Sequence, residues 1–233
     1  MSTYLWVNLL SISIPLILSF EPRFSFYKKW YAVLPAIVVG ATVFIVWDIL
    51  FTEMGVWGFN ELHLSGVHLA NLPVEEWLFF ITIPFASLFT YEVVNYHLPG
   101  NYLKKIAYPL VYGLAGILIV IGLLHADRWY TFVTFILAGL YLLMNALLLR
   151  PKYLGQFFLA YFLILIPFFI VNGVLTGSWI EQEVVYYNDA ENLGIRLFTI
   201  PIEDSVYGML LILINVNVFE RILELAGKSW PRY

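Results

Sequence analysis

The chain alternates long apolar segments with short polar ones. A helix that crosses a lipid bilayer needs about 20 mostly apolar residues. Seven segments meet this requirement, at residues 2–20, 31–50, 74–96, 105–124, 129–149, 156–176 and 201–219. Several of them contain a proline, which helices in lipid tolerate better than helices in water. The pattern predicts an all-α integral membrane bundle of seven transmembrane helices.

The composition agrees with a membrane protein. Apolar residues make up 61% of the chain and charged residues only 12%, whereas a soluble domain is usually about 25% charged. The absence of cysteine excludes disulfides and thiol catalysis. The net charge of −4 argues against nucleic acid as a partner. Membrane lipid is the expected surrounding, and the sequence carries no signal for an oligomeric state.

The basic residues are distributed unevenly between the two sets of alternating loops. One set contains only Arg128 and Arg196. The other contains Arg23, Lys28, Lys29, Lys104, Lys105, Arg150, Lys152, Arg221, Lys228 and Arg232. Cytoplasmic loops carry the excess of lysine and arginine. We therefore predict a multi-pass protein of the cell membrane with an outside N-terminus and a cytoplasmic C-terminus. The first apolar segment lacks a preceding basic residue and a small-residue cleavage site, so we expect a retained span.

Two stretches of the sequence repeat each other. A shift of 128 residues lays Pro73-Val74-Glu75-Glu76 on Pro201-Ile202-Glu203-Asp204. The first three spans then correspond to the last three, and the fourth connects them. Since four spans separate equivalent helices, the two halves run in the same direction, as in a parallel repeat. We predict a 3-1-3 arrangement with a first three-helix repeat at 1–97, a linker helix region at 98–128 and a second three-helix repeat at 129–233.

The repeated acid pairs are the candidate catalytic residues: Glu75, Glu76, Glu203 and Asp204. Proline and acids both suit the first turn of a helix, so one copy alone could be a simple helix start. Two copies at equivalent positions favour a function, because ionisable groups within spans are costly. Four carboxyl groups in one pocket cannot all be ionised. A protonated acid beside an ionised one provides a general acid and a general base.

The neighbours of each pair indicate which acid faces the bundle interior. A helical side chain returns to nearly the same face after eleven residues. That position is Ser87 for Glu76 and Asn215 for Asp204. The polar stripe favours Glu76 and Asp204 on the inner face. Glu75 and Glu203 are the identical pair under the 128-residue shift, which favours a role for them as well.

Aromatic and further acidic residues near these helix starts are candidate substrate-binding residues: Asp48, Trp77, Phe79, Phe80 and Tyr207. Interfacial aromatic residues are also ordinary membrane anchors. Beside a strong acid, ring faces stabilise a cation and an apolar cavity excludes water. Asp48 could join the acids or cap the end of its helix. No residue spacing fits a metal site, and no nucleotide fingerprint is present, so we expect neither a metal nor a cofactor.

These motifs resemble those of the membrane lycopene cyclases of the heterodimeric or fused type, in carotenoid biosynthesis. The resemblance covers the whole chain and rests on Pro73-Val74-Glu75-Glu76 and Pro201-Ile202-Glu203-Asp204. In heterodimeric members each half is a separate polypeptide, which fits the duplication. The resemblance implies that lycopene is the substrate and β-carotene or its one-ringed relative the product. The reaction is an isomerisation with no redox change, so it needs no cofactor.

Two other functions fit parts of the sequence. A carotenoid hydratase would form the same cation and trap it with water. A small sugar transporter of the SWEET type also has a 3-1-3 parallel repeat, but its acids would lie at the middle of the membrane. The motifs here begin spans at their outer ends, which favours the enzyme.

Overall fold

A computed structural model describes residues 2–23, 25–228 and 230 of the chain. The helices within these residues are α1 (Thr3–Leu18), α2 (Trp30–Glu53), α3 (Val74–His97), α4 (Lys104–Leu124), α5 (Trp129–Met144), α6 (Leu154–Leu175) and α7 (Ile202–Leu225). Short turns of other helix types occur at Phe26–Lys29, Glu61–His63 and Asn145–Leu149. The strands are β1 (Trp57–Phe59), β2 (His68–Leu69), β3 (Leu72–Pro73), β4 (Val185–Tyr187), β5 (Arg196–Leu197) and β6 (Ile200–Pro201).

The predicted all-α membrane bundle is confirmed. Six of the helical segments are long and apolar enough to cross a membrane, which makes this a multi-pass membrane protein. The first predicted span is shorter than expected, because α1 has 16 residues and is therefore only about 24 Å long. Its crossing of the membrane stays a prediction. The last helix extends beyond the predicted end at residue 219, to Leu225. Arg232, one of the residues used for the orientation, lies outside the described residues.

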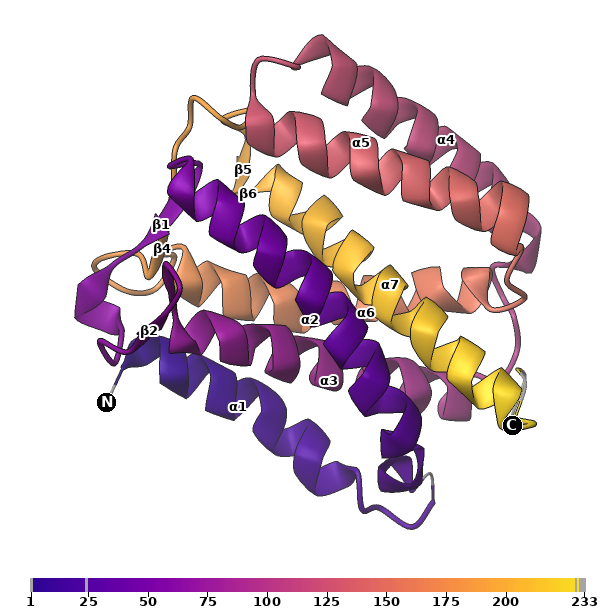
Figure 1. Cartoon of the computed structure of the whole chain (residues 1–233). Coiled ribbons are helices and arrows are strands. Elements are labelled where there is room, and N and C mark those ends of the chain that lie inside the picture. The colour runs from indigo at the N-terminus through magenta and orange to yellow at the C-terminus, as the bar shows by residue number, and fades with distance from the viewer. Residues whose placement is uncertain (1, 24, 229, 231–233) are drawn as a thin grey trace.

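The helices run alongside one another (Figure 1). In the packing, α3 contacts α1, α2 and α6, while α7 contacts α2 and α5. Helix α4 packs mainly on α5, at the edge of the bundle away from α1 (Figure 1). The N-terminus and the labelled strands lie at one end of the bundle, and the C-terminal end lies at the other. Since α3 and α7 both begin at the strand end, their first turns lie at the same end of the molecule.

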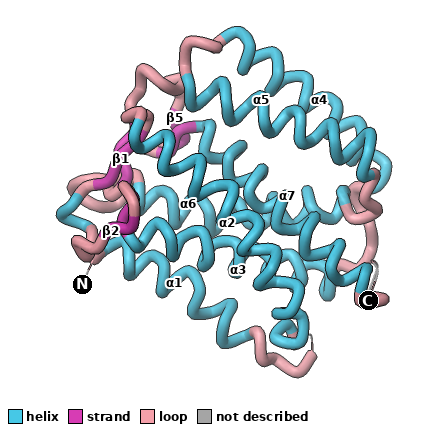
Figure 2. The backbone as a smooth tube through the Cα atoms, viewed as in Figure 1, coloured by secondary structure: helices cyan, strands magenta, loops and turns pink. Residues whose placement is uncertain are grey.

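The strands form three small ribbons at that end (Figure 2). Two of them are hairpins that lead directly into the acid motifs, with His68 opposite Pro73 in one and Arg196 opposite Pro201 in the other. The turn of each hairpin has a residue with positive φ, at Ala70 and at Phe198. These features lie 128 residues apart, in agreement with the shift found in the sequence.

The third ribbon joins the two halves of the chain. Strand β1, after α2, pairs antiparallel with β4, after α6, so that Trp57 lies opposite Tyr187 and Gly58 opposite Tyr186. A Cβ on Gly58 would lie 2.4 Å from the hydroxyl of Tyr186. A side chain at position 58 would therefore displace the exposed Tyr186 ring. The ribbon joins the loop after α2 to the loop after α6.

Candidate active site

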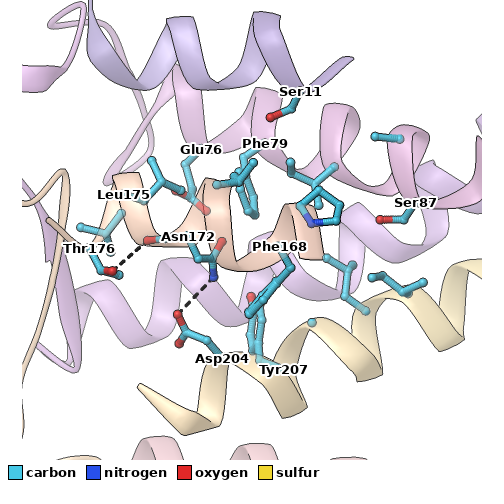
Figure 3. A pocket seen from close by; sticks show the side chains of 18 of the residues that line it. Ser11, Glu76, Phe79, Ser87, Phe168, Asn172, Leu175, Thr176, Asp204 and Tyr207 are labelled. Carbon is cyan, nitrogen blue, oxygen red and sulfur yellow. Dashed lines mark hydrogen bonds between the residues drawn. The ribbon is translucent and has the colours of Figure 1, made fainter. Parts of the chain in front are cut away.

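A pocket with about 1150 Å³ of space, including its open mouth, lies between α3, α6 and α7. Helices α1, α2 and α5 and the strands β1 and β4 complete its wall. Figure 3 shows side chains that line the pocket. Its lining extends along α3 from Glu76 to Thr90, which corresponds to about 21 Å of helix axis. Most of the lining is apolar, with Phe79, Phe168 and Leu211 among the contributing side chains. The pocket is therefore long and mostly apolar.

Three carboxylic acids lie together at the end of this pocket that is nearest the strands. Asp48 comes from α2, Glu76 from α3 and Asp204 from α7, and all three line the pocket. They are 2%, 7% and 3% exposed, respectively. The charge of Glu76 interacts with those of Asp48 and Asp204. The fold thus brings one acid from each sequence motif into a single cluster and adds the predicted Asp48.

Glu76 has one tyrosine partner. The hydroxyl of Tyr4, in the first turn of α1, donates to its Oε2 atom over 2.5 Å. Tyr4 itself is only 1% exposed. Helix α1 therefore contributes directly to the acid cluster.

Asp204 is surrounded by hydrogen-bond donors. The hydroxyl of Tyr130 donates to Oδ1 over 2.5 Å. The hydroxyl of Tyr187 and the side-chain amide of Asn172 donate to Oδ2 over 3.0 and 3.3 Å. An ionised carboxylate only accepts hydrogen bonds, and donors to both oxygens favour this form.

Only one carboxylate oxygen of Asp48 has hydrogen-bond partners among the described residues. Its Oδ1 atom accepts the indole N–H of Trp57 over 2.6 Å and the hydroxyl of Thr52 over 3.3 Å. Its Oδ2 atom is buried and has no hydrogen-bond partner among the described residues. An unpaired buried oxygen is costly. A proton on the acid or a water molecule in the pocket would satisfy it.

Glu75 and Glu203 do not line the pocket. The Oε1 atom of Glu75 accepts the hydroxyl of Ser2 and the backbone N–H of Ser65, both over 2.7 Å. The Oε1 atom of Glu203 accepts the hydroxyl of Thr131 over 2.6 Å and the backbone N–H of Leu193 over 2.8 Å. Each first acid thus ties a neighbouring helix and an outer loop to its own helix start. Both are fully buried.

The predicted aromatic residues divide between the pocket and its surroundings. Phe79 and Tyr207 line the pocket, whereas Trp77 and Phe80 do not. The indole N–H of Trp77 donates to the backbone oxygen of Leu69 over 3.1 Å, which holds the hairpin before α3. Phe80 packs on the ring of Phe44 behind the pocket wall.

Four aromatic residues beside the acids were not predicted from the sequence: Tyr4, Trp57, Tyr130 and Tyr187. The ring of Trp57 contacts that of Tyr130 over a centroid distance of 5.1 Å, and Tyr130 stacks on Tyr187 at 5.8 Å. Tyr4 and Tyr130 both lie in the first turn of a span that begins a repeat. The 128-residue shift pairs Tyr4 with Phe132 and Tyr130 with Ser2, so it does not identify these two. Trp57 and Tyr187 lie in strands β1 and β4, where only the folded chain shows which residues reach the acids.

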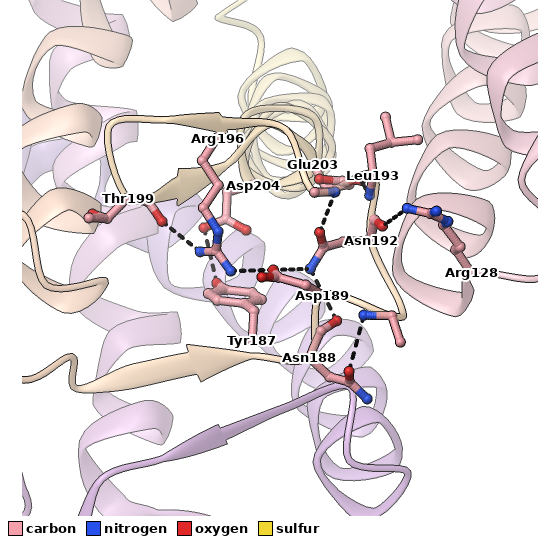
Figure 4. A network of polar contacts seen from close by, with 12 residues as sticks. Arg128, Tyr187, Asn188, Asp189, Asn192, Leu193, Arg196, Thr199, Glu203 and Asp204 are labelled. Carbon is pink, nitrogen blue, oxygen red and sulfur yellow. Dashed lines mark hydrogen bonds and ion pairs between the residues drawn. The ribbon is translucent and has the colours of Figure 1, made fainter.

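The outer loop between α6 and α7 contributes a polar network above Asp204 (Figure 4). Burial and the neighbouring carboxylate of Asp204 raise the pKa of Tyr187 well above its usual 10.0, so its hydroxyl remains a donor. The guanidinium of Arg196 lies over the Tyr187 ring at 5.9 Å and pairs with Asp189 over 2.5 Å. This hydrogen bond lowers the pKa of Asp189 below 3.8.

The described residues contain no group of three or more His, Asp or Glu side chains placed to hold a metal ion. The polar groups that line the pocket include three carboxylic acids and the hydroxyls of three tyrosines near them. Three carboxyl groups at the end of an apolar pocket can donate a proton to a bound molecule and remove another from it. The aromatic rings around them can stabilise a cation formed in between.

One comparison with known proteins gives a match. A family model described as lycopene cyclase matches residues 1–94 and 127–222, which is most of the chain. The unmatched residues between the two segments include α4. No curated protein and no solved structure matches the chain.

Proposed function

This chain belongs to the lycopene cyclase family, and we propose that it converts an end group of lycopene into a β-ring by acid–base catalysis. The observation that carries this proposal is the meeting of Asp48, Glu76 and Asp204 at the outer end of a long apolar pocket. Lycopene is a linear polyene, and its end groups are the parts that react. A pocket with its acids at one end suits a molecule that reacts at its tip.

The proposed reaction needs only a proton donor, a proton acceptor and a dry cavity. A carboxylic acid protonates the terminal double bond and leaves a tertiary cation. The neighbouring double bond attacks this cation and closes a six-membered ring. A carboxylate then removes a proton from the ring, which forms the new double bond. The product is an isomer of the substrate, so we expect no obligatory cofactor.

The rings around the acids support a cationic intermediate. Tyr207 lies within electrostatic range of all three acids, and its ring contacts those of Phe44 and Trp47 at 4.8 and 5.0 Å. A ring face attracts a nearby cation. An apolar wall excludes the water that would otherwise trap the cation.

We also propose that the substrate enters from the membrane. Several pocket-lining side chains on α1, α3 and α6 are partly or largely exposed at the bundle surface: Ser11, Phe79, Ile83, Pro167 and Val171. These positions lie within apolar helices that face lipid. Lycopene dissolves in lipid, so access between these helices requires no passage through water.

Both halves of the chain contribute to this one site. Glu76 and its partner Tyr4 belong to the proposed repeat at 1–97, while Asp204 and Tyr130 belong to the one at 129–233. Region 98–128, with α4, connects them. Corresponding hairpins, positive-φ turns and backbone N–H bonds to the first acids, each 128 residues apart, support this division. We propose that Glu76 and Asp204 act on the substrate and that Glu75 and Glu203 position them.

Expression of the chain in lycopene-accumulating bacteria, followed by chromatography of the pigments, tests the proposal. New β-carotene or its one-ringed relative is the expected result, and purified protein in liposomes should form it without added flavin or nicotinamide. Hydroxylated acyclic products would instead identify a carotenoid hydratase. Unchanged lycopene would reject this substrate and return attention to small-solute transport.

The orientation in the membrane is a separate proposal. The ten-to-two distribution of basic residues favours an outside N-terminus and a cytoplasmic C-terminus, which places the acid cluster near the outer face of the cell membrane. Reporter fusions at the two ends test it. A reporter that is active in the cytoplasm when fused to the N-terminus would reverse the orientation.

A further inference from the structure

The acids of the pocket differ in the hydrogen-bond donors around them. From this difference we infer which acid donates a proton and which accepts one. We propose that Glu76, together with Asp48, supplies the proton that starts the reaction and that Asp204 accepts the proton that ends it. This assignment rests on the proposed cyclisation and adds to it the direction in which protons cross the pocket.

The hydrogen-bond donors around Asp204 suit a proton acceptor. Tyr130, Tyr187 and Asn172 donate to its two oxygens. Figure 3 shows the amide of Asn172 directed at Asp204, and Figure 4 shows Tyr187 approaching it from the outer loop. Three donors stabilise the negative charge. Asp204 is therefore the pocket acid whose anion is best stabilised by donors, and in the proposed reaction it attracts the cation and then takes its proton.

The single donor and the neighbouring carboxyl group around Glu76 suit a proton donor. Tyr4 is its single hydrogen-bond donor among the described residues, and the charge of Asp48 acts on it. Two neighbouring carboxyl groups in an apolar site cannot both be ionised, so they retain a proton. The buried Oδ2 atom of Asp48 lacks a hydrogen-bond partner in this part of the chain, which agrees with a proton held between the two acids.

The 128-residue shift shows that equivalent positions in the two halves carry different side chains. Around Asp204, Asn172 and Tyr187 supply donors, and Thr176 lies one turn beyond Asn172. The equivalent positions in the first half of the chain hold two phenylalanines and a third acid. The pairs are Phe44 and Asn172, Asp48 and Thr176, and Phe59 and Tyr187. All but Phe44 line the pocket. Two similar halves thus provide one proton-donating side and one proton-accepting side.

The proposed cycle balances. The O–H bond of Glu76 breaks and its proton forms a C–H bond at the terminal double bond of the substrate. After ring closure, a C–H bond beside the cationic carbon breaks, its electrons form the ring double bond, and its proton bonds to Asp204. Once the product has left, water in the pocket carries this proton back to the Asp48–Glu76 pair. Each ring leaves the enzyme with the protons it started with.

Product analysis of two variants separates the roles. Glu76→Gln should form no product derived from a cation, because the first step is lost, with a fall in rate of roughly 100-fold or more. Asp204→Asn should still consume lycopene slowly but divert the cation, to a ring carrying a hydroxyl from water or to a ring with its double bond elsewhere. The reverse pattern would overturn the assignment.

Binding of a charged analogue gives a second readout that needs no turnover. The probe is a tertiary amine that replaces the cationic carbon at the end of a polyisoprenoid chain, and the control is its neutral hydrocarbon counterpart. Asp204→Asn should weaken binding of the amine by about tenfold or more, because an ionised carboxylate pairs strongly with an ammonium group. Glu76→Gln should change it by less than about threefold. Unchanged binding of the hydrocarbon establishes that each variant is folded. Equal losses of amine binding in both variants would refute the assignment.

A matched pair of milder variants tests the difference between the halves. Tyr187→Phe removes a donor from Asp204, so the fraction of diverted product should rise while lycopene is still consumed. Phe59→Tyr adds a hydroxyl at the equivalent position on the Glu76 side, so the rate should fall without diverted product. Identical effects of the two changes on product composition would contradict the proposal that one side of the pocket donates protons and the other accepts them. If the wild-type chain forms no ring at all, the proposed cyclisation fails instead.

Discussion

The Oε1 atom of Glu203 accepts the backbone N–H of Leu193 over 2.8 Å, so the outer loop is attached to the first turn of α7. Glu75 and Ser65 make the equivalent bond at the start of α3. Each acid also accepts a hydroxyl from a neighbouring helix start. The acids next to them in the sequence, Glu76 and Asp204, are thereby held in the pocket.

We expect Glu203→Gln to lower both stability and activity. The amide keeps one acceptor but loses the charge that strengthens two hydrogen bonds, and each such bond contributes about 1.5–3 kcal/mol. The thermal midpoint in detergent should fall, and turnover should fall at least about tenfold as Asp204 shifts. Glu75→Gln should behave alike. The control is Glu181→Gln, at an exposed position in the same outer loop. Full activity with an unchanged midpoint would show that neither acid holds the site together.

Loss of either Glu76 or Asp204 should stop the formation of β-rings at both ends of lycopene. Glu76→Gln and Asp204→Asn should each reduce β-ring formation by roughly 100-fold or more. Since residues that act as a unit show non-additive losses, the double variant should be little worse than either single one. Pigment chromatography, normalised to protein amount, measures this. Half-maximal turnover, or one-ringed product from only one variant, would indicate two independent sites.

Gly40 should be intolerant of a methyl group. A Cβ at this position would lie 2.3 Å from Nδ2 of Asn215, which is fully buried and donates to the backbone oxygen of Leu211 over 2.9 Å. Gly40→Ala should therefore destabilise the packing of α2 on α7 by about 1–3 kcal/mol. Its matched control is Gly116→Ala in α4, where nothing lies within 4 Å. Equal thermal midpoints of the two variants would disprove this close packing.

The ion pair of Asp189 with Arg196 should make a small contribution to stability that depends on pH. The arginine lowers the pKa of Asp189 below 3.8 in the folded protein. A lowered folded-state pKa stabilises the protein above the unfolded-state value, and the contribution is lost as the pH falls through the lowered one. Asp189→Asn should thus cost less than about 1 kcal/mol near neutrality, since the pair is exposed. The difference from wild type should vanish in strong acid. The free energy of unfolding of both proteins should be measured from neutral pH to strong acid. A difference that persists in strong acid would reject the contribution of this ion pair.

The sequence predicted the helices well because hydropathy determines which segments can lie in lipid. The prolines before Glu75 and Glu203 also placed the starts of α3 and α7 within one residue. It did not predict the six strands, because two- and three-residue ribbons have no periodicity to detect. It overestimated the first span, since Ser19 already ends α1.

For the site, the eleven-residue stripe gave different results in the two halves. It suggested inward positions for Glu76 and Asp204, and both line the pocket. Ser87 lies on the pocket wall as the stripe implies, but Asn215 packs against Gly40 on α2. Helix geometry fixes which residues share a face but not which neighbour that face meets. The bonds of Tyr4 to Glu76 and of Tyr130 to Asp204 join residues 72 and 74 positions apart in sequence, which a local pattern cannot reveal.

The location of all three pocket acids at one end has a kinetic consequence. Lycopene has two identical ends, and only one can reach the acids during a single occupancy of the pocket. A product with two rings therefore requires release of the first ring, reversal of the molecule and a second insertion. The ratio of one-ringed to two-ringed carotenoid becomes a competition between re-insertion and escape into the bilayer. The same protein would then give different pigment mixtures as the amount of lycopene in the membrane changes, with one-ringed product accumulating when fresh lycopene is abundant.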